Sequence, residues 1–192
     1  MAAILGSHNS MTYLPPKLWL MRLFSLFWRC QTNNVKHQYD KGVRCFDLRI
    51  RYVKDKWVFA HGLTLFDNVE LIEILNYLNT QSVANNEVVY VRLILETRKS
   101  DMEHENKFKE LCREVRNRYY GRLMFFEARR KFDWVKLYNF DNFEPNVVQY
   151  VGSMQTWYGK IWPWLYWKLH NKKDREQLFN HSDDTIVLYD FI

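Results

Sequence analysis

The stretch GVRCFDLRIR, residues 42–51, decides how the rest of the sequence is interpreted. Asp47, Arg49 and Arg51 are spaced two apart, so their side chains project from one face if this stretch is a β-strand. The remaining positions are mostly apolar, as expected for a buried strand. A carboxylate and a guanidinium are costly to bury on such a strand unless they pair or meet a charged ligand. The stretch therefore predicts a buried strand that carries either a structural ion pair or part of a binding site.

Two histidine-containing motifs lie on either side of this strand in the sequence. His8 lies in GSHNS at residues 6–10, and His61 lies in AHG at residues 60–62. Two histidines, an arginine and an aspartate are the groups needed for general acid–base cleavage of a phosphodiester. This combination favours a catalytic site over a lone structural ion pair.

The composition limits the class of protein. With 192 residues the chain suits one domain, residues 1–192, with a sizeable core. The formal net charge of +6 favours an anionic partner, which is a nucleic acid, an anionic membrane surface or a phosphate-bearing substrate. Cys30, Cys45 and Cys112 show no C-x-x-C spacing, so we expect reduced thiols and neither a disulfide framework nor a zinc site.

The sequence shows no targeting or membrane-spanning segment. Residues 1–10 lack the charged and apolar regions of a secretory signal. Residues 18–28 are apolar, but Arg22 interrupts them, and they are shorter than the roughly 20 residues that a spanning helix needs. We therefore expect a cytoplasmic or peripheral membrane protein, and a monomer.

Short apolar runs alternate with helical patterns along the chain. The expected strands are residues 2–5, 43–52, 57–60, 87–96, 123–126, 147–151 and 185–192, and the expected helices are 17–30, 67–78 and 102–120, with a short helix within 31–41. This alternation predicts an α/β fold with a parallel sheet. The charged candidates follow several strand ends, where (β/α) barrels carry their chemistry. The length and strand number predict a small or incomplete (β/α) barrel of the TIM type.

Two aromatic segments allow two interpretations each. Residues 17–30 form either a core helix or an interfacial helix, in which Trp19 and Trp28 lie at the level of the lipid headgroups. Residues 157–169 include Trp162 and Trp164 and are followed by lysines. This segment is either part of the core or a rim that dips into the headgroup layer.

Three motifs together resemble the X domain of phosphatidylinositol-specific phospholipase C, and most closely its bacterial, metal-independent branch. They are GSHNSMTY at residues 6–13, QY at 38–39 with GVRCFDLR at 42–49, and HG at 61–62. Residues 187–191 are similar to the last strand of the family. The resemblance implies a TIM-type barrel that cleaves phosphatidylinositol or a related glycophospholipid. The products would be diacylglycerol and an inositol cyclic phosphate.

The resemblance also implies a role for five residues. His8 would be the general base that deprotonates the inositol 2-hydroxyl. His61 would be the general acid that protonates the departing glycerol oxygen. Arg49 would neutralise the phosphate oxygens, and Asp47 would orient Arg49 or His61. Asp190 would hold the base histidine, as the carboxylate does in a Ser-His-Asp triad.

Arg49 occupies the position at which the calcium-using branch of the family has a carboxylate. A cation there would repel Ca²⁺, so we expect no catalytic metal and no cofactor. Asn9 departs from the bacterial pattern, which has aspartate there, although its amide can still hydrogen-bond a phosphate. Arg92 and Glu96 are the charged residues of the fourth strand, and we expect Asn9, Arg92 and Glu96 to bind substrate.

Three other functions remain open at this point. The chain could be a membrane-binding X-like domain with little turnover, although its complete set of candidate residues argues against a decayed site. It could be a metal-dependent glycerophosphodiester phosphodiesterase, but the expected H-R-G and E-x-D patterns are missing. Nucleic-acid binding ranks last, because the positive charges are spread along the chain without a binding motif.

Overall fold

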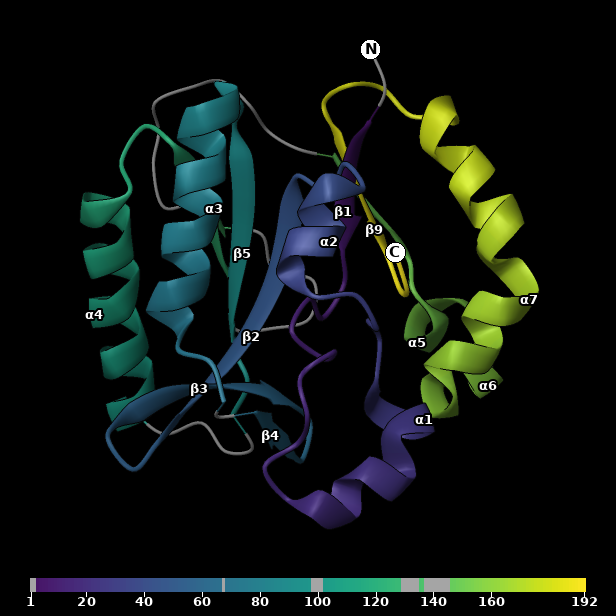
Figure 1. Cartoon of the computed structure of the whole chain (residues 1–192), viewed down its shortest axis with the longest axis horizontal. Coiled ribbons are helices and arrows are strands. Elements are labelled where there is room, and N and C mark those ends of the chain that lie inside the picture. The colour runs from purple at the N-terminus through teal and green to yellow at the C-terminus, as the bar shows by residue number, and fades with distance from the viewer. Residues whose placement is uncertain (1–2, 67, 98–101, 129–134, 137–145) are drawn as a thin grey trace.

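The computed structural model describes residues 3–66, 68–97, 102–128, 135–136 and 146–192. One curled sheet dominates it, with the strand order β7-β6-β5-β2-β1-β9-β8 (Figure 1). The strands are β1 Ile4–Ser7, β2 Cys45–Val53, β3 Lys56–His61, β4 Thr64–Phe66, β5 Val89–Leu95, β6 Leu123–Ala128, β7 Val135–Lys136, β8 Asn146–Tyr150 and β9 Thr185–Tyr189. Neighbours from β6 to β8 along this order pair in parallel, whereas β7, β3 and β4 join by antiparallel pairing.

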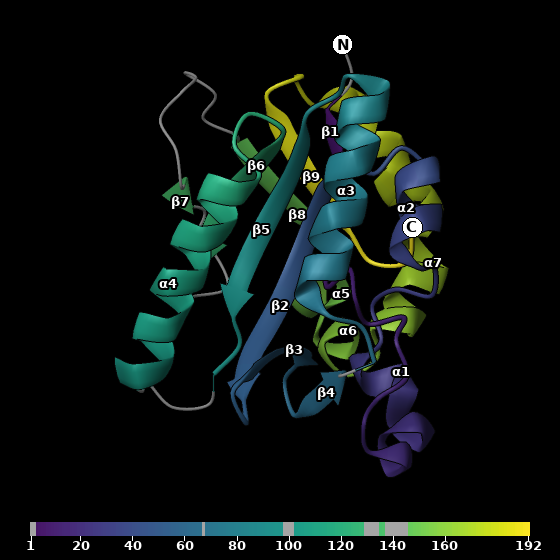
Figure 2. The ribbon, with the colours of Figure 1, turned by 60° about the vertical axis from the view of Figure 1, so that its left-hand side comes forward.

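The long helices cover the outer face of the curled sheet, as the two views show (Figures 1 and 2). The helices are η1 Trp19–Phe24, α1 Ser25–Trp28, α2 Val35–Asp40, α3 Leu71–Asn85, α4 Met102–Arg118, α5 Gly152–Gln155, α6 Trp157–Ile161, α7 Pro163–Glu176 and η2 Gln177–Asn180. The result is an α/β fold whose sheet curls as half of a barrel, which confirms the predicted small or incomplete barrel. No helix among the described residues is long and apolar enough to cross a lipid bilayer.

The core follows from the apolar pattern of the parallel strands. The β5 sequence VYVRLIL and the β9 sequence TIVLY are almost entirely buried, as is usual for parallel strands covered on both faces. Leu75 and Leu78 from α3 join the same cluster as Phe108 and Val115 from α4. Charged side chains remain on the exposed face of α4, as expected from its sequence.

Two of the predicted helices differ from the observed ones, and the aromatic segment 157–169 forms two helices. The segment 17–30 is not one helix but a 3₁₀ helix, η1, followed by the single turn α1. Helix α3 begins at Leu71 and extends to Asn85, beyond the predicted range 67–78. The aromatic segment is broken at Trp162, since the proline at 163 disfavours a helical conformation at the residue before it.

Candidate active site

Strand register brings three of the candidate residues into one row. Ser7 at the end of β1 pairs with Phe46 of β2 on one side and with Tyr189 of β9 on the other. The next residue of each chain segment is His8, Asp47 or Asp190. Because the three strands run in parallel with this register, the three residues lie side by side across the sheet.

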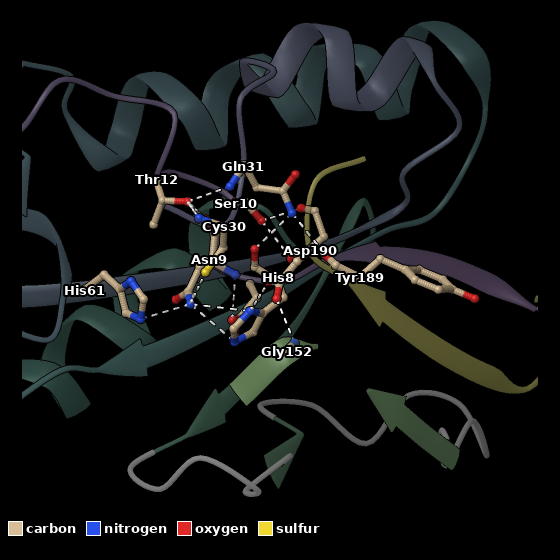
Figure 3. Close-up of polar contacts among 12 residues, drawn as sticks. His8, Asn9, Ser10, Thr12, Cys30, Gln31, His61, Gly152, Tyr189 and Asp190 are labelled. Atoms are coloured by element: carbon tan, nitrogen blue, oxygen red, sulfur yellow. Dashed lines mark hydrogen bonds and ion pairs between the residues drawn. The ribbon is translucent and has the colours of Figure 1, made fainter. Parts of the chain in front are cut away.

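His8 is held from both sides in a buried position. Its Nδ1 lies 2.7 Å from Asp190 Oδ1, and the other Asp190 oxygen accepts a hydrogen bond from the backbone N–H of Gly152 at 3.0 Å (Figure 3). Arg49 Nη2 lies 2.8 Å from His8 Nε2. A guanidinium can only donate, so Nε2 must accept. Neutral His8 therefore carries its proton on Nδ1 and presents a lone pair on Nε2.

Arg49 is surrounded by carboxylates. Its Nε lies 3.3 Å from Asp47 Oδ2, and its Nη1 lies 3.6 Å from Glu96 Oε2. Burial alone would lower the pKa of Arg49, but Asp47 and Glu96 raise it above its usual value. The guanidinium is therefore a permanent positive charge, directed at His8.

Asp47 is the buried carboxylate that pairs with both Arg49 and Arg92. Burial opposes its ionisation, but Arg49 and Arg92 outweigh burial and lower the pKa of Asp47 to about 2. Arg92, which pairs with Asp47 in the β2–β5 register, donates to Asp47 Oδ1 at 3.3 Å and has no exposed surface. Arg92 thus lies beside Asp47 and is fully buried in this structure, and its contact with substrate stays a prediction.

His61 is held differently. Its Nδ1 lies 2.7 Å from the carbonyl oxygen of Trp28, so Nδ1 carries the proton and Nε2 the lone pair. Burial and, next, the charge of Arg49 lower the pKa of His61 to about 4. In the free protein at neutral pH this imidazole is neutral.

Asn9 joins the two histidines. Its Nδ2 lies 3.2 Å from His8 Nε2 and 3.3 Å from His61 Nε2, so one amide lies between the two imidazoles (Figure 3). The Asn9 backbone has φ of 49°, a left-handed conformation that asparagine tolerates, and its N–H donates to Asp47 Oδ2 at 3.0 Å. Both imidazoles and the Arg49 guanidinium thus surround a single position.

The structure adds residues to this site that sequence reasoning missed. Cys30 is buried, with Sγ 3.4 Å from Asn9 Nδ2, and burial followed by the charge of Asp190 raises the pKa of its thiol. Gln31 donates to the carbonyls of His8 at 3.1 Å and Tyr189 at 2.9 Å. No local pattern in the sequence points to either residue. The contact of the Gly152 backbone amide with Asp190 could not be predicted either, because a backbone group leaves no pattern in the sequence.

The four tryptophans that are candidates for a membrane interface divide into two groups. Trp28 is buried against Phe66, and its indole N–H donates to the Met21 carbonyl at 2.9 Å. Its assignment to a membrane interface is wrong for this conformation, because the ring fills the core beside the site. Trp19 and Trp164 are exposed, and Trp162 is partly buried against Phe27.

The sequence profile of the family described as "Phosphatidylinositol-specific phospholipase C, X domain" matches residues 21–139. The chain belongs to this family. The matched range includes Asp47, Arg49 and His61, whereas His8 and Asp190 lie outside it.

The fold is similar to that of solved bacterial members of the family. The phosphatidylinositol-specific phospholipase C from Listeria monocytogenes is 16% identical, with a TM-score of 0.66 over 99% of this chain and 88% of its own. A mutant of the Staphylococcus aureus enzyme is 15% identical, with a TM-score of 0.66 over 98% of this chain and 84% of its own. No curated protein sequence matches the chain. At these identities the likeness is one of fold.

Proposed function

We propose that this chain is a phospholipase C that cleaves phosphatidylinositol or a related glycophospholipid by intramolecular attack on the phosphate. The inositol 2-hydroxyl oxygen would form the new bond to phosphorus, and the bond from phosphorus to the glycerol oxygen would break. The products would be diacylglycerol and an inositol cyclic phosphate. The observation that carries this proposal is His8, fixed between Asp190 and Arg49 with its Nε2 lone pair toward the site.

His8 would act as the general base. Its Nε2 would take the proton of the 2-hydroxyl, and Asp190 would stabilise the imidazolium that forms, as in a Ser-His-Asp triad. Arg49 now contacts this same nitrogen at 2.8 Å, so a bound phosphate would draw the guanidinium away and expose the lone pair. Arg49 would then neutralise charge on the phosphate oxygens, the main requirement of phosphoryl transfer.

His61 would act as the general acid that protonates the glycerol oxygen. Its Nε2 must first gain a proton, which the pKa of about 4 disfavours at neutral pH. An anionic phosphate between the histidines would raise this pKa, because it favours the charged imidazolium. Asn9 is uncharged, so its amide does not raise the pKa of His61 as an anionic phosphate would. We therefore propose that the departure of the glycerol oxygen is catalysed less effectively than the attack by the inositol 2-hydroxyl.

A metal-dependent glycerophosphodiester phosphodiesterase is less consistent with this site. Arg49 contributes a fixed positive charge at the centre, and it is paired with Asp47 and Glu96. These carboxylates are engaged by guanidinium groups and are poorly placed to collect a hard divalent cation. We propose that the guanidinium supplies the charge neutralisation that a metal supplies in such enzymes.

An exposed apolar surface near the site supports a membrane-bound substrate. Trp19 and Leu23 of η1 are 67% and 69% exposed, and Phe27 of α1 is 45% exposed. In Figure 1 the η1–α1 segment lies beyond the carboxyl ends of the central strands, the end at which His8 and Asp190 lie. Lys168 lies over the Trp164 ring, 5.1 Å from its centroid. Aromatic rings with nearby basic residues suit an anionic lipid surface.

Phosphorus NMR of phosphatidylinositol vesicles tests the proposal directly. Protein incubated with the vesicles and a chelator should produce the distinctive signal of a five-membered cyclic phosphate. His8→Ala should abolish the signal, and the exposed His37→Ala is the matched control that should retain it. Vesicle binding without any product would favour the membrane-binding domain with little turnover. Loss of activity in chelator would favour the metal-dependent alternative.

A further inference from the structure

Cys30 lies beside the pair formed by His8 and Asp190, although the three residues are far apart in the sequence. A ring nitrogen of His8, the Cys30 sulfur and a carboxylate oxygen of Asp190 all lie within 4.8 Å of one another (Figure 3). All three side chains are buried, with exposed fractions of 3%, 1% and 4%. The three residues therefore form a compact cluster in which each offers one potential metal ligand.

The donor types in this cluster select a particular class of cation. Imidazole nitrogen, thiolate sulfur and carboxylate oxygen are the ligands of Zn²⁺ and of softer ions such as Cd²⁺. A thiolate and a carboxylate together carry two negative charges, which balance a divalent ion in a buried place. Ca²⁺ and Mg²⁺ prefer oxygen ligands and have little affinity for a thiolate.

Asn9 offers a fourth donor. Its Oδ1 is buried and, within the described part of the chain, has no hydrogen-bond partner. Its Nδ2 lies 3.4 Å from Cys30 Sγ. A half-turn of the side-chain amide would exchange Oδ1 and Nδ2. The unpartnered oxygen would then face Cys30 Sγ and could act as a metal ligand. Four ligands from nitrogen, sulfur and two oxygens would complete the tetrahedral coordination that Zn²⁺ adopts.

We propose that His8, Cys30 and Asp190 form a binding site for Zn²⁺ and similar thiophilic divalent ions, and that the bound ion inhibits catalysis. The inhibitory part rests on the proposed function, whereas the binding part does not. Binding would open the 2.7 Å His8–Asp190 contact by roughly half an ångström, to fit metal–ligand bonds of about 2.0–2.1 Å.

The proton balance explains the inhibition. The Cys30 thiol would release one proton to solvent and bind as thiolate. On His8 the metal would replace the proton on Nδ1, and the ring would stay neutral by carrying its proton on Nε2. Arg49 would turn from Nε2 toward Asp47 and Glu96, which it already contacts. His8 would then have no lone pair with which to deprotonate the inositol hydroxyl.

Cadmium titration tests the binding part on untagged, metal-free protein. We expect the ultraviolet absorption of a cadmium–thiolate bond to saturate at one Cd²⁺ per chain. Cys30→Ser should lose this absorption, and Cys112→Ser is the matched control that should keep it, because Cys112 lies in α4 and belongs to no such cluster among the described residues. Absence of the absorption in the unmodified chain would overturn the proposal, whether or not the variants fold.

Inhibition by Zn²⁺ tests the regulatory part, with each variant compared to its own metal-free activity. Cys30→Ser should raise the half-inhibitory Zn²⁺ concentration at least about tenfold, and excess chelator should restore activity to the unmodified chain. Equal inhibition of Cys30→Ser and the unmodified chain would overturn it. If the metal-free protein cleaves no phosphatidylinositol but shows the cadmium–thiolate absorption, the proposed function fails and the metal site stands.

Discussion

The two histidines of the site have the same side chain but unequal surroundings. His8 faces a carboxylate on one nitrogen and a guanidinium on the other, which fix its tautomer and prepare it to accept a proton. His61 faces a backbone carbonyl and the neutral Asn9 amide, and its pKa is lowered to about 4. In the proposed mechanism the base half is already aligned in the free protein and needs only the release of Arg49 from Nε2, whereas the acid half must also gain a proton when substrate binds.

Removing each histidine in turn is the strongest test of this inequality. His8→Ala should lower kcat by about 10³-fold or more, and His61→Ala by a smaller factor of about 10²-fold. The reason is that His8 is already aligned, whereas His61 is rarely protonated before substrate binds. Release of inositol cyclic phosphate measures both rates. Equal losses would mean that the two halves of the site contribute equally.

Arg49→Lys tests whether the base half depends on a planar guanidinium. We expect kcat to fall by about 10²-fold, because lysine is a single point charge and cannot contact Asp47, Glu96 and phosphate together. Arg44→Lys is a matched control, since Arg44 lies just before the same strand and pairs with Glu87 at the surface. Unchanged kcat in Arg49→Lys would remove Arg49 from the mechanism.

Asn9→Asp should give His61 a neighbouring carboxylate, as His8 already has in Asp190. A carboxylate beside His61 favours the imidazolium and raises its pKa above the present value of about 4. The acid form exists below the pKa, so kcat/KM should fall at a higher pH in the variant than in the unmodified chain. Rates at neutral pH should rise by about tenfold, since one pKa unit changes the protonated fraction by that factor. A pH profile that does not move would contradict a role for His61 as the acid.

Trp19→Ala and Trp28→Ala separate exposed from buried aromatic residues. Trp19→Ala should weaken sedimentation with anionic vesicles a few-fold and leave the thermal midpoint unchanged, because the ring is exposed. Trp28→Ala should instead lower the free energy of unfolding by about 3–5 kcal/mol, the usual cost of deleting a buried aromatic ring. Thermal unfolding and vesicle sedimentation on the same samples distinguish the two effects. Unchanged vesicle binding by Trp19→Ala would exclude η1 from the membrane surface.

Local pattern predicted much of the fold. The parallel strands at β2, β5, β6 and β9 were recognisable because buried parallel strands are apolar along their length. Helix limits were less predictable. The segment 17–30 is apolar nearly all round, and such a pattern does not distinguish an α-helix from the 3₁₀ turn and short helix observed.

The sequence by itself determined the family, the half-barrel class and the presence of His8, Asp47, Arg49, His61 and Asp190, because strand periodicity and short motifs are local properties. Only the tertiary structure decided which groups meet. It buried Arg92 beside Asp47, placed Trp28 in the core and brought Cys30 beside His8 and Asp190. The physical reason is that contacts between distant segments depend on strand register and loop closure, which side-chain periodicity along one segment does not encode.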